Sequence, residues 1–127
     1  MDMSYSYKPV LLKAIFAHAD AKGRVKISGI VDYFRGFYEA RRNAGLIAEK
    51  ANSIYAKGNY TDKDVERNIL SNPFKRFEDM NMMRHTKTLG MVEVDSTVWK
   101  RLSADDKINI IKICDDKLEK YYQRIIK

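Results

Sequence analysis

The side chains best suited to binding a ligand gather between Ser71 and Gly90, a stretch in which cations outnumber acids. Lysine and arginine bind phosphate oxygens, and arginine and asparagine can form hydrogen bonds with base edges. This composition therefore indicates DNA binding. The candidate DNA-contacting residues are Lys75, Arg76, Asn81, Arg84, His85 and Lys87, with Arg41 and Arg42 as flanking phosphate clamps. The alternative is an ordinary solvated helix face, which would carry the same charges.

Acidic residues beside this basic stretch come close to a metal-dependent nuclease pattern without completing it. That pattern needs one acid followed by Glu-x-Lys on a strand, and Asp79 and Glu93 could supply its carboxylates. Asp95 stands where the lysine is required, so the triad fails. The two histidines and the single cysteine are scattered, and the sequence has no glycine-rich phosphate loop. We therefore predict no enzymatic activity, no catalytic residue, no bound metal and no cofactor.

The size and composition of the chain limit the classes of protein to which it can belong. At 127 residues it fits one domain, and its 45% hydrophobic content argues against intrinsic disorder. The formal net charge of +7 favours a polyanionic partner, although charge of this size also serves solubility alone. The single cysteine, Cys114, rules out an internal disulfide and fits a reducing compartment. With no signal peptide and no apolar run of membrane-spanning length, we expect a cytoplasmic protein without membrane contact.

The basic residues belong to a predicted short helix and to the hairpin that follows it. Asn72 and Pro73 begin the helix, because Asn caps free N–H groups and Pro at the first position loses no hydrogen bond. Apolar residues then recur every third position, at Phe74, Phe77, Met80 and Met83. Apolar and polar residues alternate through 91–95, as in a half-buried strand. A short basic helix followed by a small basic hairpin is typical of a winged helix-turn-helix.

The N-terminal part of the chain shows two more helices and a strand. Residues 1–6 are expected to form a flexible tail, and a helix opens at Tyr7. Residues 24–28 alternate in the manner of a short strand. Ser28 then caps a second, aromatic-rich helix, which Gly45 stops.

Capping signals also mark the helices of the C-terminal part. Thr61 and Ser103 each begin a capping-box pattern, the first opening a short helix that ends at Ser71 and the second a long final helix. The segment 45–60 is too apolar for a free linker, so it is either functional or hides a further element.

Four segments of the chain carry a resemblance to a known group of proteins: YSYKPVLLKAIF, VDYFRGFYEARR, SNPFKRFEDMNMMRHTKTLGMVEVD and DDKLEKYYQRI. They resemble an accessory module attached to DEAD/DEAH-box helicase-type proteins and HNH restriction proteins of prokaryotic defence loci. The most specific part is Asn-Pro-Phe-Lys-Arg-Phe at 72–77. The resemblance implies a nucleic-acid context and a helicase or nuclease partner. It assigns no functional residue, and the helicase and nuclease motifs of such proteins are missing here.

These patterns together predict one α+β domain over 1–127, mostly helical. It is a winged helix-turn-helix-like domain with a short β-hairpin and an additional long C-terminal helix. The predicted function is non-catalytic binding of double-stranded DNA, linked to a prokaryotic restriction, defence or phage system. The alternative is a protein–protein adaptor or inhibitor in such a system, which would use the C-terminal helix and the segment 45–60 as its contact surface.

Overall fold

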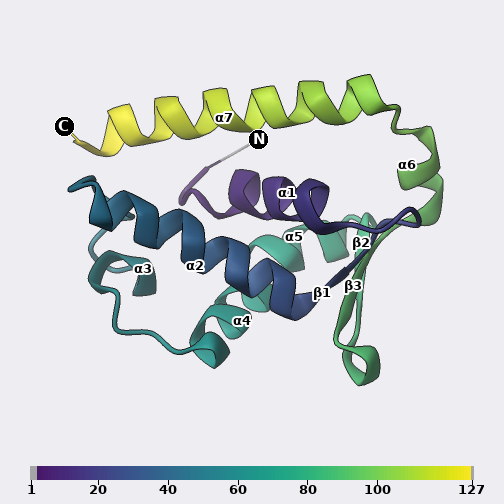
Figure 1. The fold of residues 1–127 in the computed structure, drawn as a ribbon, viewed down its shortest axis with the longest axis horizontal. Coiled ribbons are helices and arrows are strands. Elements are labelled where there is room, and N and C mark those ends of the chain that lie inside the picture. Colours follow the sequence, from purple (N-terminus) through teal and green to yellow (C-terminus); the bar gives the residue numbers. More distant parts are fainter. Residues whose placement is uncertain (1–2, 127) are drawn as a thin grey trace.

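The computed structural model describes residues 3–126, which form seven α-helices, one short 3-10 turn and three strands (Figure 1). In chain order these are α1 (Tyr7–His18), β1 (Arg24–Lys26), α2 (Ile27–Asn43), α3 (Ile54–Lys57), α4 (Asp62–Ser71), α5 (Pro73–Asp79), β2 (Met83–Thr86), η1 (Lys87–Leu89), β3 (Met91–Val94), α6 (Ser96–Arg101) and α7 (Ala104–Ile126). Figure 1 shows α7 running along one edge of the molecule above α1, while the β2–β3 hairpin projects at the opposite edge. The predicted α+β, mostly helical class is confirmed. Among these residues, no helix combines the length and apolarity needed to cross a lipid bilayer.

The strands form one small antiparallel sheet in the order β1–β3–β2. Val25 pairs with Val92 and Met83 pairs with Val94, and all four side chains are buried. Because side chains alternate across a strand, the intervening residues form the outer face of the sheet. One sheet face therefore belongs to the hydrophobic core, and the other is open to solvent.

Local capping signals place three helix boundaries where the sequence predicts them. Thr61 Oγ1 accepts the Asp64 N–H at 3.2 Å, and an Asp64 carboxylate oxygen accepts the Thr61 N–H at 2.9 Å. Ser103 and Asp106 exchange the same two hydrogen bonds at the start of α7. Gly45 follows α2 with a φ of +75°, the left-handed geometry that ends many helices.

One predicted strand boundary and two predicted caps are wrong. β1 ends at Lys26 and α2 begins at Ile27, so Ser28 lies exposed inside the helix. The Ile27 N–H donates to the Gly90 carbonyl at 2.8 Å, so the hairpin satisfies a donor that a side-chain cap would otherwise take. Asn72 precedes α5 as predicted, but within residues 3–126 its side chain makes no capping hydrogen bond to that helix.

Three of the four residues in the predicted apolar stripe are buried, but only Phe74 and Phe77 lie on α5, since Met83 belongs to β2. Phe74, Phe77 and Met83 are buried, whereas Met80 is 57% exposed. The reason is that α5 ends at Asp79, so helical spacing no longer applies to Met80. The chain turns there and enters β2 with a different periodicity.

The segment 45–60 hides a helix, α3, and contributes to the core. Ala48, Glu49 and Tyr55 within it are buried. The Tyr55 ring stacks on the Tyr38 ring of α2, with 4.1 Å between the ring centroids. This segment is therefore mostly structural, and its turns let it pass over the aromatic side of α2.

The start of α1 is also fixed more firmly than predicted. Of the flexible tail expected over 1–6, residues 1–2 lie outside the described residues, and Ser6 is fully buried. The Ser6 N–H donates to Glu49 Oε2 at 2.9 Å, and the Ser6 hydroxyl lies 2.6 Å from the Tyr38 hydroxyl. The expectation of a tail is wrong at Ser6, because two distant parts of the chain hold it.

Candidate nucleic-acid interface

A hollow lined by one face of α4 and by the hairpin lies between α4 and the hairpin tip. Figure 1 shows α4 and the hairpin tip on the same side of the molecule. We call this hollow the α4–hairpin groove; its volume is about 710 Å³, and it is lined by Ile27, Lys63, Glu66, Arg67, Leu70, Ser71, His85, Lys87 and Gly90. It is wide and open, so it suits an extended ligand more than a small molecule.

One wall of the groove is the outer face of α4. Lys63 and Arg67 lie four residues apart and therefore on the same side of the helix. Val65 and Ile69 are buried on the other side, which fixes the rotation of α4 about its axis. The Arg67 side chain is 74% exposed and contacts Asp64 at 3.6 Å, a pairing too open to hold it.

The other wall is the hairpin. The half-buried His85 ring packs edge-to-face with the Phe74 ring, with 6.1 Å between the centroids. Lys87 begins the 3-10 turn at the tip and is exposed. Gly90 closes that turn with a φ of +59°, a conformation that a side chain would strain. The groove is thus lined by three cations and a histidine against one acid, Glu66.

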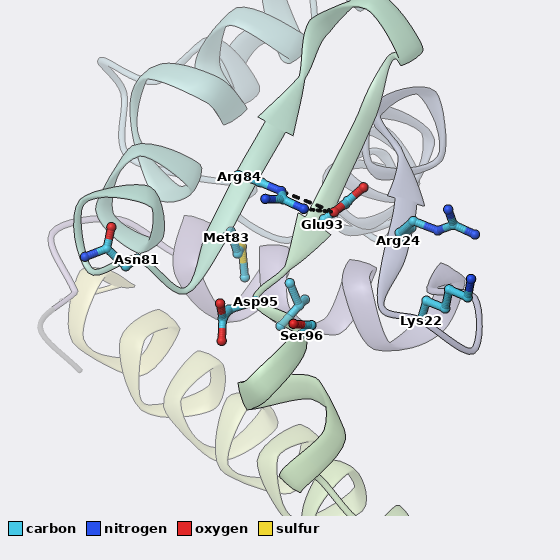
Figure 2. A pocket seen from close by; sticks show the side chains of 9 residues that line it. Lys22, Arg24, Asn81, Met83, Arg84, Glu93, Asp95 and Ser96 are labelled. Carbon is cyan, nitrogen blue, oxygen red and sulfur yellow. Dashed lines mark hydrogen bonds and ion pairs between the residues drawn. The ribbon is translucent and has the colours of Figure 1, made fainter.

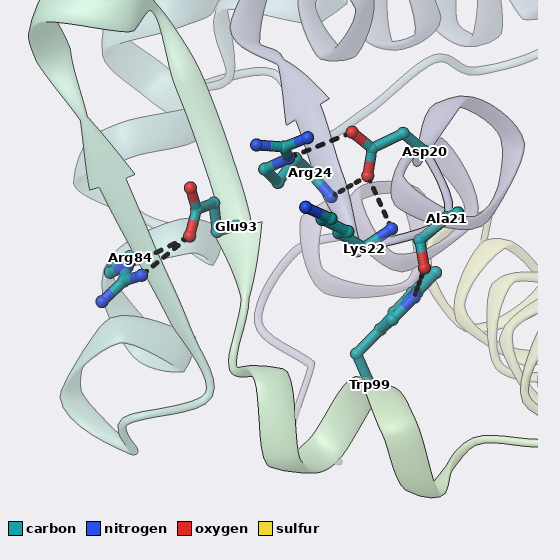
Figure 3. A network of polar contacts seen from close by, with 7 residues as sticks. All are labelled: Asp20, Ala21, Lys22, Arg24, Arg84, Glu93 and Trp99. Carbon is teal, nitrogen blue, oxygen red and sulfur yellow. Dashed lines mark hydrogen bonds and ion pairs between the residues drawn. The ribbon is translucent and has the colours of Figure 1, made fainter.

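A second hollow lies on the outer face of the sheet, and Figure 2 shows the residues around it. The Arg84 guanidinium pairs with Glu93 Oε2 at 2.9 Å across the β2–β3 ladder. On β1, Arg24 Nε pairs with Asp20 Oδ2 at 3.1 Å (Figure 3). Each of these two arginines has a carboxylate partner on this face, and the predicted contact Arg84 lies outside the α4–hairpin groove.

The two cations predicted on the recognition helix also lie elsewhere. Lys75 Nζ contacts Glu78 at 3.4 Å and Asp79 at 3.0 Å on its own helix. The hydrogen bond to Asp79, followed by that to Glu78, raises the pKa of Lys75. Arg76 lines a different hollow together with Tyr5 of the N-terminal segment. Neither Lys75 nor Arg76 therefore lines the α4–hairpin groove.

Asn81, predicted to read base edges, has a backbone role at the end of α5 and lies outside the α4–hairpin groove. Its φ of +58° is left-handed, and it directly follows the α5 cap residue Met80. The Asn81 N–H donates to the Glu78 carbonyl at 2.9 Å, and the Met82 N–H donates to the Phe77 carbonyl at 2.9 Å. These two bonds form a Schellman motif, in which Asn is the usual substitute for Gly.

Arg41 and Arg42, the predicted phosphate clamps, both make contacts inside the fold. Arg41 Nε donates to the Ile47 carbonyl at 2.7 Å, and its guanidinium lies 3.4 Å from the centre of the Tyr122 ring. Arg42 donates to the Tyr55 carbonyl at 2.9 Å and to the Tyr60 hydroxyl at 3.2 Å. Both arginines tie the segment 45–60 to α2.

The three acids considered for a nuclease site each have a separate contact. Asp79 pairs with Lys75, Glu93 pairs with Arg84, and Asp95 accepts the Val98 N–H as the cap of α6. Within residues 3–126, no group of three or more metal-ligating side chains is placed to hold an ion.

Of the eight predicted contact residues, the groove brings together only His85 and Lys87. Sequence reasoning missed Lys63 and Arg67, whose i, i+4 spacing opposite Val65 and Ile69 was the available signal. Comparisons with protein-family models, curated proteins and solved structures found no match to this chain. The resemblance to defence-locus modules therefore stays a prediction from the sequence.

Proposed function

We propose that this protein binds double-stranded DNA without catalysis, through the α4–hairpin groove. One observation carries the proposal: Lys63 and Arg67 on a helix face and Lys87 on a hairpin tip line the same open groove. A B-DNA major groove accepts an α-helix, and cations on neighbouring elements can contact the flanking phosphates.

The pairing of β1 with the hairpin supports the proposal. In a winged helix-turn-helix, a recognition helix enters the major groove and the following hairpin forms the wing. Here α1, β1, α2, α3, α4 and α5 precede the hairpin, with α5 between α4 and β2, and β1 pairs with the second hairpin strand, β3. We assign α4 as the recognition helix, because its outer face lines the same groove as the hairpin, and we assign the β2–β3 hairpin as the wing. This replaces α5, the recognition helix that the sequence predicts.

The groove residues divide into two roles under this proposal. Lys63 and Lys87 contact phosphates and supply affinity, which depends on salt because each contact releases counterions. Arg67 is placed one turn along α4 from Lys63 and is the candidate for reading a guanine edge. His85 is half-buried against Phe74 and positions the wing more than it contacts DNA.

The biological setting that fits this proposal is the one implied by the resemblance: a DNA-binding module that serves a helicase or nuclease partner in a restriction or phage-defence system. A second candidate function is a protein–protein adaptor. It is favoured by Leu46 and Ile47, which are 51% and 44% exposed at the start of the segment 45–60.

The proposal is tested by fluorescence anisotropy of a labelled duplex at several salt concentrations. With about three phosphates neutralised, log affinity should fall with log salt at a slope of about −3. Lys63→Ala/Arg67→Ala should weaken binding and flatten that slope by nearly two units, with an unchanged melting temperature. Lys75→Ala/Arg76→Ala removes equal charge from α5 and is the matched control, so it should bind almost as the parent does.

Two outcomes would count against the α4–hairpin groove. A flat salt response in the parent protein would remove the DNA proposal and favour the adaptor. A larger loss in the Lys75 and Arg76 variant than in the Lys63 and Arg67 variant would move the DNA contact back to α5.

A further inference from the structure

The first half of α7 carries isoleucines that the fold does not bury. Ile108 is 50% exposed and Ile113 is 53% exposed, and Ile110 between them is only half-buried. Isoleucine is a weaker helix former than Lys, Glu or Ala, so exposed helix positions gain nothing from it unless a partner covers them. Figure 1 shows this half of α7 at the periphery of the molecule.

The spacing of residues along α7 defines a stripe with charges at both ends. Asp106, Ile110, Ile113 and Lys117 are separated by four, three and four residues, so they lie along one side of the helix. The N-terminal end of this stripe is acidic and the C-terminal end is basic. We call it the α7 stripe.

The charges of the α7 stripe are complementary to those of a second copy only when the two helices run antiparallel. Residues 110 and 113 are centred on the same point of the helix as residues 106 and 117. If Ile110 of one copy faces Ile113 of the other, Asp106 of each copy therefore faces Lys117 of its neighbour. A parallel arrangement would bring like charges together, which is unfavourable. Asp106 already accepts the Ser103 N–H, but a carboxylate can accept several donors at once.

We propose that the protein forms a two-fold symmetric dimer through antiparallel contact of its α7 stripes. The contact is isologous, since the same surface serves both copies. A single pair of helices buries less area than a standard interface of about 1,600 Å², so the dimer is a weak one, with a dissociation constant of about 1–100 µM. This proposal does not depend on DNA binding.

Sedimentation equilibrium of the full chain, at concentrations spanning about a hundredfold, tests the dimer. The parent should show a reversible monomer–dimer equilibrium. Ile113→Asp should raise the dissociation constant at least about tenfold, because it places an acid at the centre of the contact. Ile108→Asp is the matched control, because Ile108 is about as exposed as Ile113 but lies off the α7 stripe. The Ile108→Asp variant should dimerise with nearly the dissociation constant of the parent.

A charge swap tests the antiparallel register. Lys117→Asp should weaken the dimer, and adding Asp106→Lys should restore it, because the pair is then reversed but still complementary. Circular dichroism of each variant checks that α7 remains helical without the Asp106 cap. A parent that stays monomeric throughout, a larger effect of Ile108→Asp than of Ile113→Asp, or a swap without rescue would each overturn the proposal.

Discussion

Glu49 shows how one buried carboxylate can hold distant parts of a small domain together. It is 3% exposed and accepts hydrogen bonds from the Ser6 N–H, the Ser6 hydroxyl and the Tyr121 hydroxyl. The Lys50 N–H donates to it at 2.8 Å. These donors come from the start of α1, from α7 and from the segment 45–60. A buried charge is tolerable here because hydrogen-bond donors surround it.

Replacing this carboxylate by an amide should therefore destabilise the fold. In Glu49→Gln, one acceptor oxygen becomes an N–H₂ group that faces donors, so at least one buried donor loses its partner. We expect the free energy of unfolding to fall by about 1–3 kcal/mol. Urea denaturation measures the change, and Glu119→Gln on the exposed side of α7 should cost less than about 0.5 kcal/mol. Equal effects of the two variants would contradict the role assigned to Glu49.

Asn81 gives a second prediction at this scale. Its left-handed φ of +58° costs a residue with a Cβ about 1–2 kcal/mol, a cost that Asn reduces and Gly removes. Asn81→Ala should therefore lower the free energy of unfolding, whereas Asn81→Gly should leave it nearly unchanged. Both variants should bind DNA as the parent does. A loss of DNA affinity in the stable Asn81→Gly variant would indicate that the Asn81 side chain contacts DNA.

Among the elements, α6 depends on one close approach to the turn before β1. Trp99 is buried, and its Nε1 donates to the Ala21 carbonyl at 3.0 Å (Figure 3). A Cβ on Gly23 would lie 2.7 Å from a Trp99 ring carbon, and Gly23 has a φ of +80°. The ring can occupy this position only because residue 23 has no side chain.

Gly23→Ala should displace Trp99 and loosen α6 from the sheet. Backbone strain and steric overlap together predict a loss of about 2–4 kcal/mol, measured by thermal or urea denaturation. Gly36→Ala is the matched control, since a Cβ added to this residue of α2 would meet nothing within 4 Å. That change should raise stability by about 0.5–1 kcal/mol, because Ala is the better helix former. Comparable losses in both variants would contradict the packing described.

Across the whole molecule, buried tyrosines link stability to alkaline pH. Burial, the largest cause, raises the pKa of Tyr7 and of Tyr122 to about 12. Burial likewise raises the pKa of Tyr38 and of Tyr55. The unfolded chain, with tyrosine pKa values of about 10, loses these protons first. The folded state therefore binds more protons above that pH, and stability falls as pH rises.

Stability should accordingly hold up to about pH 10 and then fall between about pH 10 and pH 12. Urea denaturation at several pH values in this window measures the slope. Tyr7→Phe should make the slope shallower, because one of the groups with a raised pKa is gone. A free energy of unfolding that does not change across the window would contradict the burial of these hydroxyls.

Much of the local structure follows from nearby residues and is predictable from the chain alone. Thr61 with Asp64, Ser103 with Asp106, and Gly45 satisfy backbone groups only a few residues away, so their signals survive in any tertiary context. Apolar periodicity likewise identifies the long helices and the hairpin, because a one-sided stripe must face a core.

The candidate site could not be predicted in the same way, because charge alone does not say which cations face a ligand. Arg41 and Arg42 look free in the sequence, but packing turns both onto carbonyls of the segment 45–60 and Arg41 onto the Tyr122 ring of α7. The groove joins Lys63 to Lys87, and only the packing of α4 near the hairpin places them on one surface. Contacts between residues far apart in the chain depend on how whole elements pack. Composition identified a basic protein, and tertiary structure decided which of its charges remain on an open surface.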